Sequence, residues 1–183
     1  MAASVAPGTN PDKIVIIGAG MGGIAMEAQL KRLLNHDDFE IYKKLDIGGT
    51  WAHNKYPNLS CDVPSEVGRL HGDALHISNL VQFYSFSFFQ NSEWSEKFAS
   101  QREILDHIHA CARHFRLEPH ISLQQECVSI RWSERDGLWT CLFRDLVHDK
   151  TYEVKARYVV TAIGVLNIPN SVGDLPVLKN FGG

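Results

Sequence analysis

Basic runs are missing from this sequence. Its 183 residues carry 18 basic and 21 acidic side chains, which gives a formal net charge of -3. A protein without a basic patch or stripe lacks the electrostatic footprint with which nucleic acids and anionic membrane surfaces are bound. We therefore expect neither a nucleic acid nor a membrane among the partners of this chain.

Paired cysteines and long apolar runs are also missing. The four cysteines form no Cys-x-x-Cys pair and match no metal motif, so we expect reduced thiols, a cytoplasmic location and no metal site; they are Cys61, Cys111, Cys127 and Cys141. No apolar run approaches the roughly 18 residues of a membrane span, and residues 1–12 lack the pattern of a signal peptide. We expect a flexible leader over residues 1–12, followed by one domain.

A glycine turn between an apolar run and a helical pattern is the most informative feature. Residues 14–17 are all β-branched, which is typical of a strand buried on both faces of a parallel sheet. The glycines of a GxGxxG motif follow at once and predict a dinucleotide site, in which the pyrophosphate faces a helix N-terminus: Gly18, Gly20 and Gly23. The helix is expected to bury an apolar stripe made of Met26, Leu30, Leu33 and Leu34.

The second predicted strand, residues 39–42, ends where a carboxylate should hold the ribose hydroxyls of the dinucleotide. Lys43 stands there instead. Glu40 lies inside the strand and Asp46 lies beyond it, so neither is an obvious substitute.

Several later segments carry a family resemblance. Residues 47–51 are Ile-Gly-Gly-Thr-Trp, residues 54–57 are Asn-Lys-Tyr-Pro, and residues 61–65 are Cys-Asp-Val-Pro-Ser. Tyr-Ser-Phe-Ser at 84–87 and Glu-Trp-Ser-Glu-Lys-Phe-Ala-Ser-Gln at 93–101 continue the match. Together they closely resemble the flavin monooxygenases that include the Baeyer–Villiger enzymes, especially those of fungal secondary metabolism.

The resemblance implies an FAD site. In that family the segment that matches Gly48, Gly49, Thr50 and Trp51 wraps the flavin and its pyrophosphate. The aspartate that matches Asp62 lies beside the isoalloxazine, which makes Asp62 the candidate catalytic residue. The backbone near Cys127 would meet the adenine, and Gly164 would end the strand beneath the cofactor. From the residues alone, Trp51 could stack on a flat ring and a carboxylate could tune it; the alternative is a core aromatic and a turn residue.

The remaining pattern predicts one more helix and a β-meander. Ser100 and Glu103 form a capping box at the start of the helix, in which we expect Cys111 to be a buried thiol between surface histidines, His107 and His114, rather than a metal ligand. Residues 121–155 should form an antiparallel β-meander, in which alternation suggests one core-facing row of Val128, Ile130 and Trp132.

The expected fold is therefore α/β, a Rossmann-like, three-layer FAD-binding fold with a parallel sheet and an inserted antiparallel β-meander, incomplete relative to the family. Residues 13–183 would be a partial FAD-binding domain. Residues 66–83 match nothing in the family, and either a surface loop or a translated intron would explain them. The family's second GxGxx(G/S) turn, which serves NADPH, has no counterpart in the sequence, so we expect a truncated form without an NADPH domain.

Two functions remain open. In complete relatives NADPH reduces FAD, and oxygen then gives a C4a-(hydro)peroxyflavin that oxygenates the substrate, here expected to be a small apolar secondary metabolite. NADPH would reach this chain only through a partner, and a homo- or hetero-oligomer would cover the incomplete domain. The alternative is a degenerate remnant that acts as a partner subunit, or as a cofactor-free pocket for a rearrangement or cyclisation.

Overall fold

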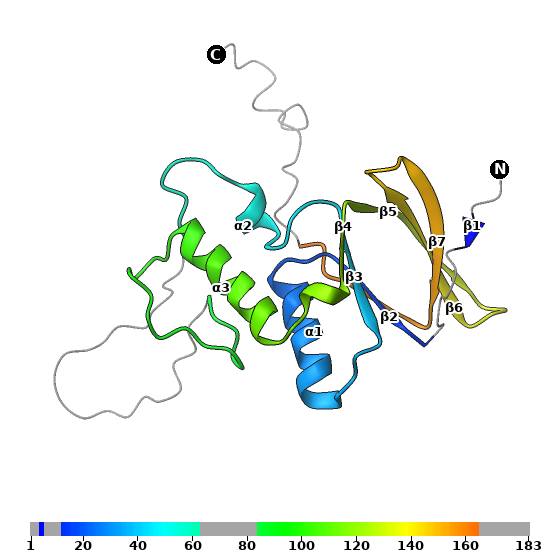
Figure 1. The fold of residues 1–183 in the computed structure, drawn as a ribbon, viewed down its shortest axis with the longest axis horizontal. Coiled ribbons are helices and arrows are strands. Elements are labelled where there is room, and N and C mark those ends of the chain that lie inside the picture. Colours follow the sequence, from blue (N-terminus) through cyan, green and yellow to red (C-terminus); the bar gives the residue numbers. More distant parts are fainter. Residues whose placement is uncertain (1–3, 6–11, 63–83, 165–183) are drawn as a thin grey trace, which may run out of the picture.

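The protein folds into three layers in a computed structural model that describes residues 4–5, 12–62 and 84–164 (Figure 1). Helices form the first layer, a parallel sheet the second and a mainly antiparallel sheet the third. The elements are β1 (Ser4–Val5), β2 (Ile14–Ile17), α1 (Met21–Leu34), β3 (Phe39–Lys43), α2 (Thr50–His53), α3 (Gln101–His114), a 3₁₀ turn (Glu118–His120), β4 (Ile121–Leu123), β5 (Gln125–Ser133), β6 (Leu138–Asp145), β7 (Lys150–Ala156) and β8 (Tyr158–Thr161).

The parallel sheet has the strand order β4-β3-β2-β8, and every pair in it is parallel. Successive side chains of β2 point to opposite faces, as a strand requires. Ile16 packs into the helical layer with residues of α1 and α3, whereas Val15 and Ile17 pack against the meander. An unbroken β-branched run therefore suits β2, because both of its faces are buried.

Glu40 of β3 links β4 with the residue that precedes β2. Its carboxylate accepts hydrogen bonds from Lys13 Nζ at 2.8 Å and from Ser122 Oγ at 2.6 Å. These bonds hold the pKa of Glu40 below its ordinary value although burial acts in the opposite direction. The carboxylate of Glu40 is thus already hydrogen-bonded within the sheet, beside β4.

The third layer is the predicted meander. Strands β5, β6 and β7 pair in antiparallel order, and its core holds Phe143 stacked on Tyr42 of β3, with 4.0 Å between ring centroids. The meander begins at Gln125 and not at residue 121, because Ile121–Leu123 pair with β3 and the chain then turns at Gln124, whose φ is 59°. In the predicted leader, Ser4–Val5 pair with β7 as β1.

A β-bulge changes which residues of β5 face the core. The register shifts between Cys127 and Ser129, so one extra residue enters β5 opposite β6. Cys127 and Ile130 pack against the meander core, while Val128 and Trp132 are 53% and 42% exposed. The predicted core-facing row is therefore right for Ile130 and wrong for Val128 and Trp132.

The helical layer contains two further differences from expectation. In α1, Leu30 is buried and Met26 packs against the core as predicted, but Leu33 and Leu34 in the last turn before the C-cap Asn35 are 63% and 69% exposed. The capping box of α3 is present, but His107, predicted at the surface, is buried against Phe86, Phe89 and Trp94.

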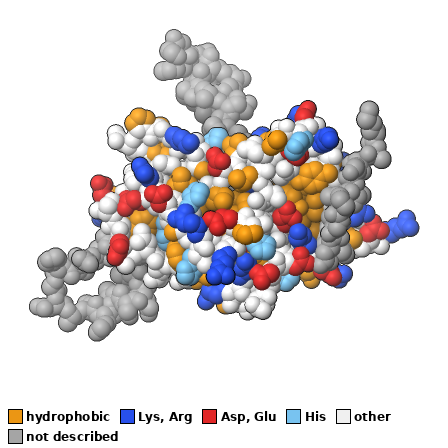
Figure 2. Space-filling model, in the orientation of Figure 1, with side chains coloured by type: hydrophobic (Ala, Val, Ile, Leu, Met, Phe, Trp, Pro, Cys, Tyr) orange, Lys and Arg blue, Asp and Glu red, His pale blue; other side chains and the backbone are white. Residues whose placement is uncertain are grey.

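The surface carries charges of both signs. On the face shown in Figure 2, acidic and basic side chains are interspersed among hydrophobic ones. Among the residues described, no helix has the length and hydropathy needed to cross a membrane, and no group of three or more His, Cys, Asp or Glu could hold a metal ion. The predicted insertion at 66–83 lies outside the described residues.

Candidate nucleotide-binding site

The candidate site begins at the turn after β2. Gly18 has a φ of 110°, and a Cβ there would lie 2.3 Å from the carbonyl oxygen of Ala162, so only glycine fits. The Gly18 amide donates to Tyr42 O at 3.0 Å, and the Ala162 amide donates to Ile17 O at 2.8 Å. The turn is thereby fixed between the ends of β3 and β8.

Helix α1 starts directly from this turn. A Cβ on Gly23 would lie 1.9 Å from Gly18 O, so Gly23 lets the first turn of the helix pack on the strand end. Gly20 is the N-cap and makes no side-chain cap, and the first turn contains no acidic residue. Within the described residues, neither the N-cap nor an acidic residue of the first turn offers a side-chain acceptor to the amide groups at the start of α1, an arrangement that favours a bound anion.

A second glycine segment lies against the first. The Gly48 amide donates to Ala19 O at 2.8 Å, and Gly49 adopts a φ of 60° and a ψ of -128°. A Cβ on Gly49 would lie 2.9 Å from Gly20 Cα, and a Cβ on Gly20 would lie 3.5 Å from Gly49 Cα. The two backbones thus meet without side chains between them.

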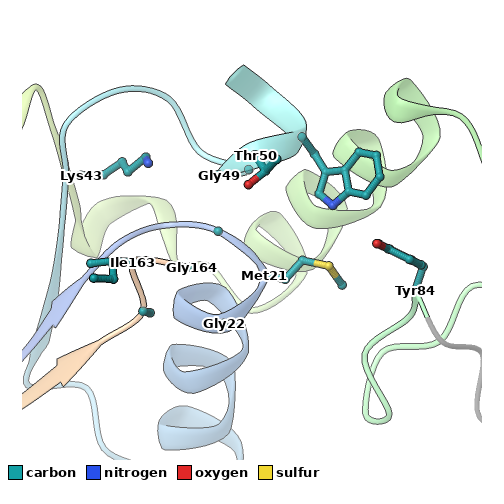
Figure 3. Close-up of a pocket in the computed structure, with 12 residues that line it drawn as sticks. Met21, Gly22, Lys43, Gly49, Thr50, Tyr84, Ile163 and Gly164 are labelled. Carbon is teal, nitrogen blue, oxygen red and sulfur yellow. The ribbon is translucent and has the colours of Figure 1, made fainter. Parts of the chain in front are cut away.

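A cavity of about 290 Å³ opens over this contact (Figure 3). That volume is near the lower end for small-molecule pockets. Seven of the residues predicted for the cofactor line it: Gly20, Lys43, Gly48, Gly49, Thr50, Trp51 and Gly164.

Aromatic side chains form one wall. Trp51 and Tyr84 meet edge to face with 5.3 Å between ring centroids, and the Trp51 carbonyl accepts a hydrogen bond from the side-chain amide of Gln101 in α3. Burial raises the pKa of Tyr84, and the nearby Asp62 and Cys61 raise it further. Asp62 itself is exposed and does not line the cavity, although it lies close enough to act on Tyr84.

Lys43 lies at the carboxyl end of β3 and lines this cavity together with a neighbouring one of about 240 Å³. Its side chain extends from the strand end toward the glycine segments (Figure 3). Burial lowers the pKa of Lys43, and the charge of Asp46 offsets part of that shift. The lysine therefore occupies the position predicted for the ribose partner.

Besides Asp62, three other predicted residues lie outside the first cavity, for different reasons. Gly18 and Gly23 shape the turn and the helix start from below. Cys127 is half-buried at the bulge of β5 and lines neither of the two cavities, and burial raises the pKa of its thiol.

Five lining residues were not predicted: Met21, Gly22, Tyr84, Ala162 and Ile163. Met21 and Gly22 fill variable positions of the glycine motif, so the motif alone does not select them. Tyr84 carried a signal, because it opens the Tyr-Ser-Phe-Ser match. Ile163, two residues after the end of β8, is 65% exposed and lines the cavity with an apolar side chain.

The chain is similar in sequence to known nucleotide-binding proteins and flavin monooxygenases. Residues 16–83 match the model of the NAD(P)-binding Rossmann-like domain. A Baeyer–Villiger monooxygenase from Pseudomonas aeruginosa is 35% identical over 93% of this chain and 28% of its own length. A Baeyer–Villiger monooxygenase from the fungus Stachybotrys chlorohalonatus is 30% identical over 93% of this chain and 24% of its own length.

A solved structure shows the same fold. The crystal structure of OTEMO in complex with FAD and NADP is 25% identical, has a TM-score of 0.69, and is matched over 96% of this chain and 29% of its own. The resemblance to Baeyer–Villiger-type flavin monooxygenases and the Rossmann-like, three-layer fold are thus confirmed. The chain spans about a quarter of the length of the relatives that it matches.

Proposed function

We propose that this chain binds an adenine dinucleotide of the FAD type and is the cofactor-holding part of a monooxygenase that acts on a small apolar metabolite. The observation that carries the proposal is the contact between Gly20 and Gly49 beside the uncapped start of α1. A pyrophosphate needs hydrogen-bond donors and close approach, and a helix start without a side-chain cap beside side-chain-free backbone suits it.

The residues around the contact fit the rest of such a cofactor. Trp51 and Tyr84 offer an apolar wall to a flat ring, and Gly164 leaves the facing side open, because a Cβ there would meet nothing within 4 Å. FAD, when bound, supplies the redox chemistry. The chain's own residues bind the cofactor, orient it and exclude water.

Asp62 is proposed to act from the rim of this site. Its charge reaches Tyr84, which connects it with the aromatic wall. Because its charge acts on Tyr84, the Asp62 carboxylate can also act on the charge of a ring held against Trp51 and Tyr84, without lining the cavity itself. The catalytic role of Asp62 stays a prediction.

Lys43 favours a second candidate function, a remnant with weakened FAD binding. An ammonium in place of a carboxylate cannot accept hydrogen bonds from ribose hydroxyls. The loss of such a charge-assisted bond typically costs about 1.5 to 3 kcal/mol, which is roughly tenfold or more in affinity. A remnant of this kind would act as a partner subunit or as a cofactor-free pocket.

Visible spectroscopy separates the two candidates. The chain is purified from a flavin-replete host, and bound flavin is quantified before and after addition of FAD. A flavin band near stoichiometry supports the proposed function, and no flavin band even with added FAD supports the remnant.

A matched pair of glycine variants tests the location. Gly49 and Gly137 have φ values of 60° and 61°, but a Cβ on Gly49 meets Gly20 Cα whereas one on Gly137 meets nothing within 4 Å. Both changes put a side chain at a left-handed φ, which costs about 1 to 3 kcal/mol, and the change at Gly49 is the more strained of the two because its ψ is -128°. We expect Gly49→Ala to lose dinucleotide affinity at least tenfold and Gly137→Ala to keep it. Equal affinities would place the pyrophosphate elsewhere.

The proposal extends to cell location and partners. None of the four cysteines forms a disulfide, and burial raises the pKa of Cys111 and Cys141 to about 12, so both stay protonated and unreactive. A reducing compartment, the cytoplasm, suits such thiols. NADPH and a subunit that supplies its site are the proposed partners.

A further inference from the structure

The end of β3 is where a Rossmann fold selects its nucleotide. A carboxylate there holds free ribose hydroxyls, and a basic group nearby accommodates a phosphate on the ribose instead. In this chain Lys43 ends β3, and it lines the cavity that holds the Gly20–Gly49 contact. Lys43 is therefore positioned to contact the ribose of a bound adenosine.

A basic cavity continues from that position. The neighbouring cavity of about 240 Å³ shares Lys43 and Gly49 with the first, so the two adjoin. Its charged lining consists of three lysines and one aspartate, namely Lys43, Lys44, Lys55 and Asp46; His53 also lines it. The formal lining charge is positive with His53 neutral.

The three lysines are not equivalent. Lys44 is paired with Glu126 at 2.6 Å, and Lys55 is exposed at the rim. Lys43 is partly buried, and in the part of the chain that the structure describes its ammonium has no ion pair; Asp46 acts on it only through its charge. Glu40, the nearest acidic residue in β3, is held by Lys13 and Ser122.

We infer that this cavity binds a phosphate group carried on the adenosine ribose, so that the site prefers an adenine nucleotide phosphorylated there over one with free hydroxyls. This inference rests on the proposed function, because the glycine turn must hold the pyrophosphate. A partly buried ammonium without a partner is better solvated by a dianionic phosphate than by a neutral sugar. Asp46 opposes the phosphate and limits the preference.

Paired ligands test the inference directly. Isothermal titration compares ADP-ribose with 2′-phospho-ADP-ribose, which differ only in the phosphate, and 3′-phospho-ADP compared with ADP distinguishes the two positions on the ribose. We expect the wild-type chain to prefer a phosphorylated ligand of one of these pairs by about 10- to 100-fold, as for a charge-assisted hydrogen bond. The preference should decrease as salt is raised.

Variants assign the preference to Lys43. Lys43→Met should abolish it, and Lys43→Glu should reverse it and raise affinity for FAD, whose ribose carries only hydroxyls. Asp46→Asn should strengthen it. Lys150→Glu, the same charge reversal at an exposed residue of β7, is the matched control and should leave the ratio unchanged.

The outcomes separate the inference from the proposed function. If the wild-type chain binds each ligand pair with equal affinity, or if Lys43→Met keeps the preference, the inference is overturned while the dinucleotide site stands. If neither ADP-ribose nor its phosphorylated form binds, and FAD does not bind either, the proposed function fails and the inference fails with it.

Discussion

Glu27 gives this protein an unusual and measurable pH dependence. The side chain lies on the buried face of α1 with 0% of its surface exposed, and neither carboxylate oxygen has a hydrogen-bond partner among the described residues. Burial raises its pKa from the ordinary 4.5 to about 8, against the opposing charge of Lys31. At pH 7 the folded protein therefore holds a proton on Glu27 that the unfolded chain releases.

The sign and size of the effect follow from these two pKa values. Below pH 4.5 both states are protonated and Glu27 has no effect. Between about 4.5 and 8 the folded state binds more protons, so the free energy of unfolding falls as pH rises, by up to about 1.4 kcal/mol per pH unit. Between pH 5 and 7.5 the loss amounts to about 3 kcal/mol.

Glu27→Gln removes this titration and keeps the shape of the side chain. Urea unfolding of both proteins, followed by circular dichroism at pH values from 5 to 8, gives the free energy at each pH. We expect the variant to gain about 3 kcal/mol relative to wild type between pH 5 and 7.5. Other ionisable groups cancel in this difference.

Glu134→Gln, at an exposed position of the β5–β6 turn, is the control for the formal charge change. It should follow the wild-type pH profile. If Glu27→Gln also runs parallel to wild type from pH 5 to 8, then the carboxyl of Glu27 is not held protonated by burial, and the reasoning is refuted.

Two further predictions concern the helices. Gly23→Ala should destabilise the fold strongly in urea unfolding, since its Cβ would lie 1.9 Å from Gly18 O, whereas Gly22→Ala should be neutral or stabilising, since its nearest neighbour would be 3.8 Å away. Equal effects would contradict the packing role of Gly23. Ser100→Ala should cost about 1 kcal/mol and lower the melting temperature by about 2 to 4 °C, because the Glu103 amide loses its acceptor. An unchanged melting temperature would show that the cap contributes nothing.

Local patterns were sufficient to predict most of the fold. The β-branched run, the glycine turn and the helix after it specify β2 and α1 through short-range sterics and burial. The capping box located the start of α3, and hairpin turns such as Gly137 separated the strands of the meander. In each case the determinant lies within a few residues of the element that it sets.

The predictions that were wrong concern residues whose burial depends on segments distant in the sequence. His107 is buried because Phe86, Phe89 and Trp94 cover α3, and no spacing within the helix predicts that cover. The bulge in β5 depends on pairing with β6, so alternation along β5 alone placed Val128 on the core face, although its side chain is exposed.

The residues that line the cavity also differ in whether local sequence predicts them. Glycine positions and Lys43 were predictable, because close backbone approach and the end of a strand leave marks in the sequence. Tyr84 was missed as a lining residue, since it comes from a segment more than 30 positions beyond Trp51 and meets it only through the fold.

The commitment of Glu40 to Lys13 and Ser122 has a consequence for how such a site can diverge. Glu40 makes the hydrogen bonds that hold β3 to β4 and to Lys13. A substitution of Lys43, at the end of the same strand, would leave these bonds in place. A single codon change at position 43 can then alter which cofactor is accepted while the scaffold persists. Selection on ligand choice and selection on folding would act on separate residues of one short strand.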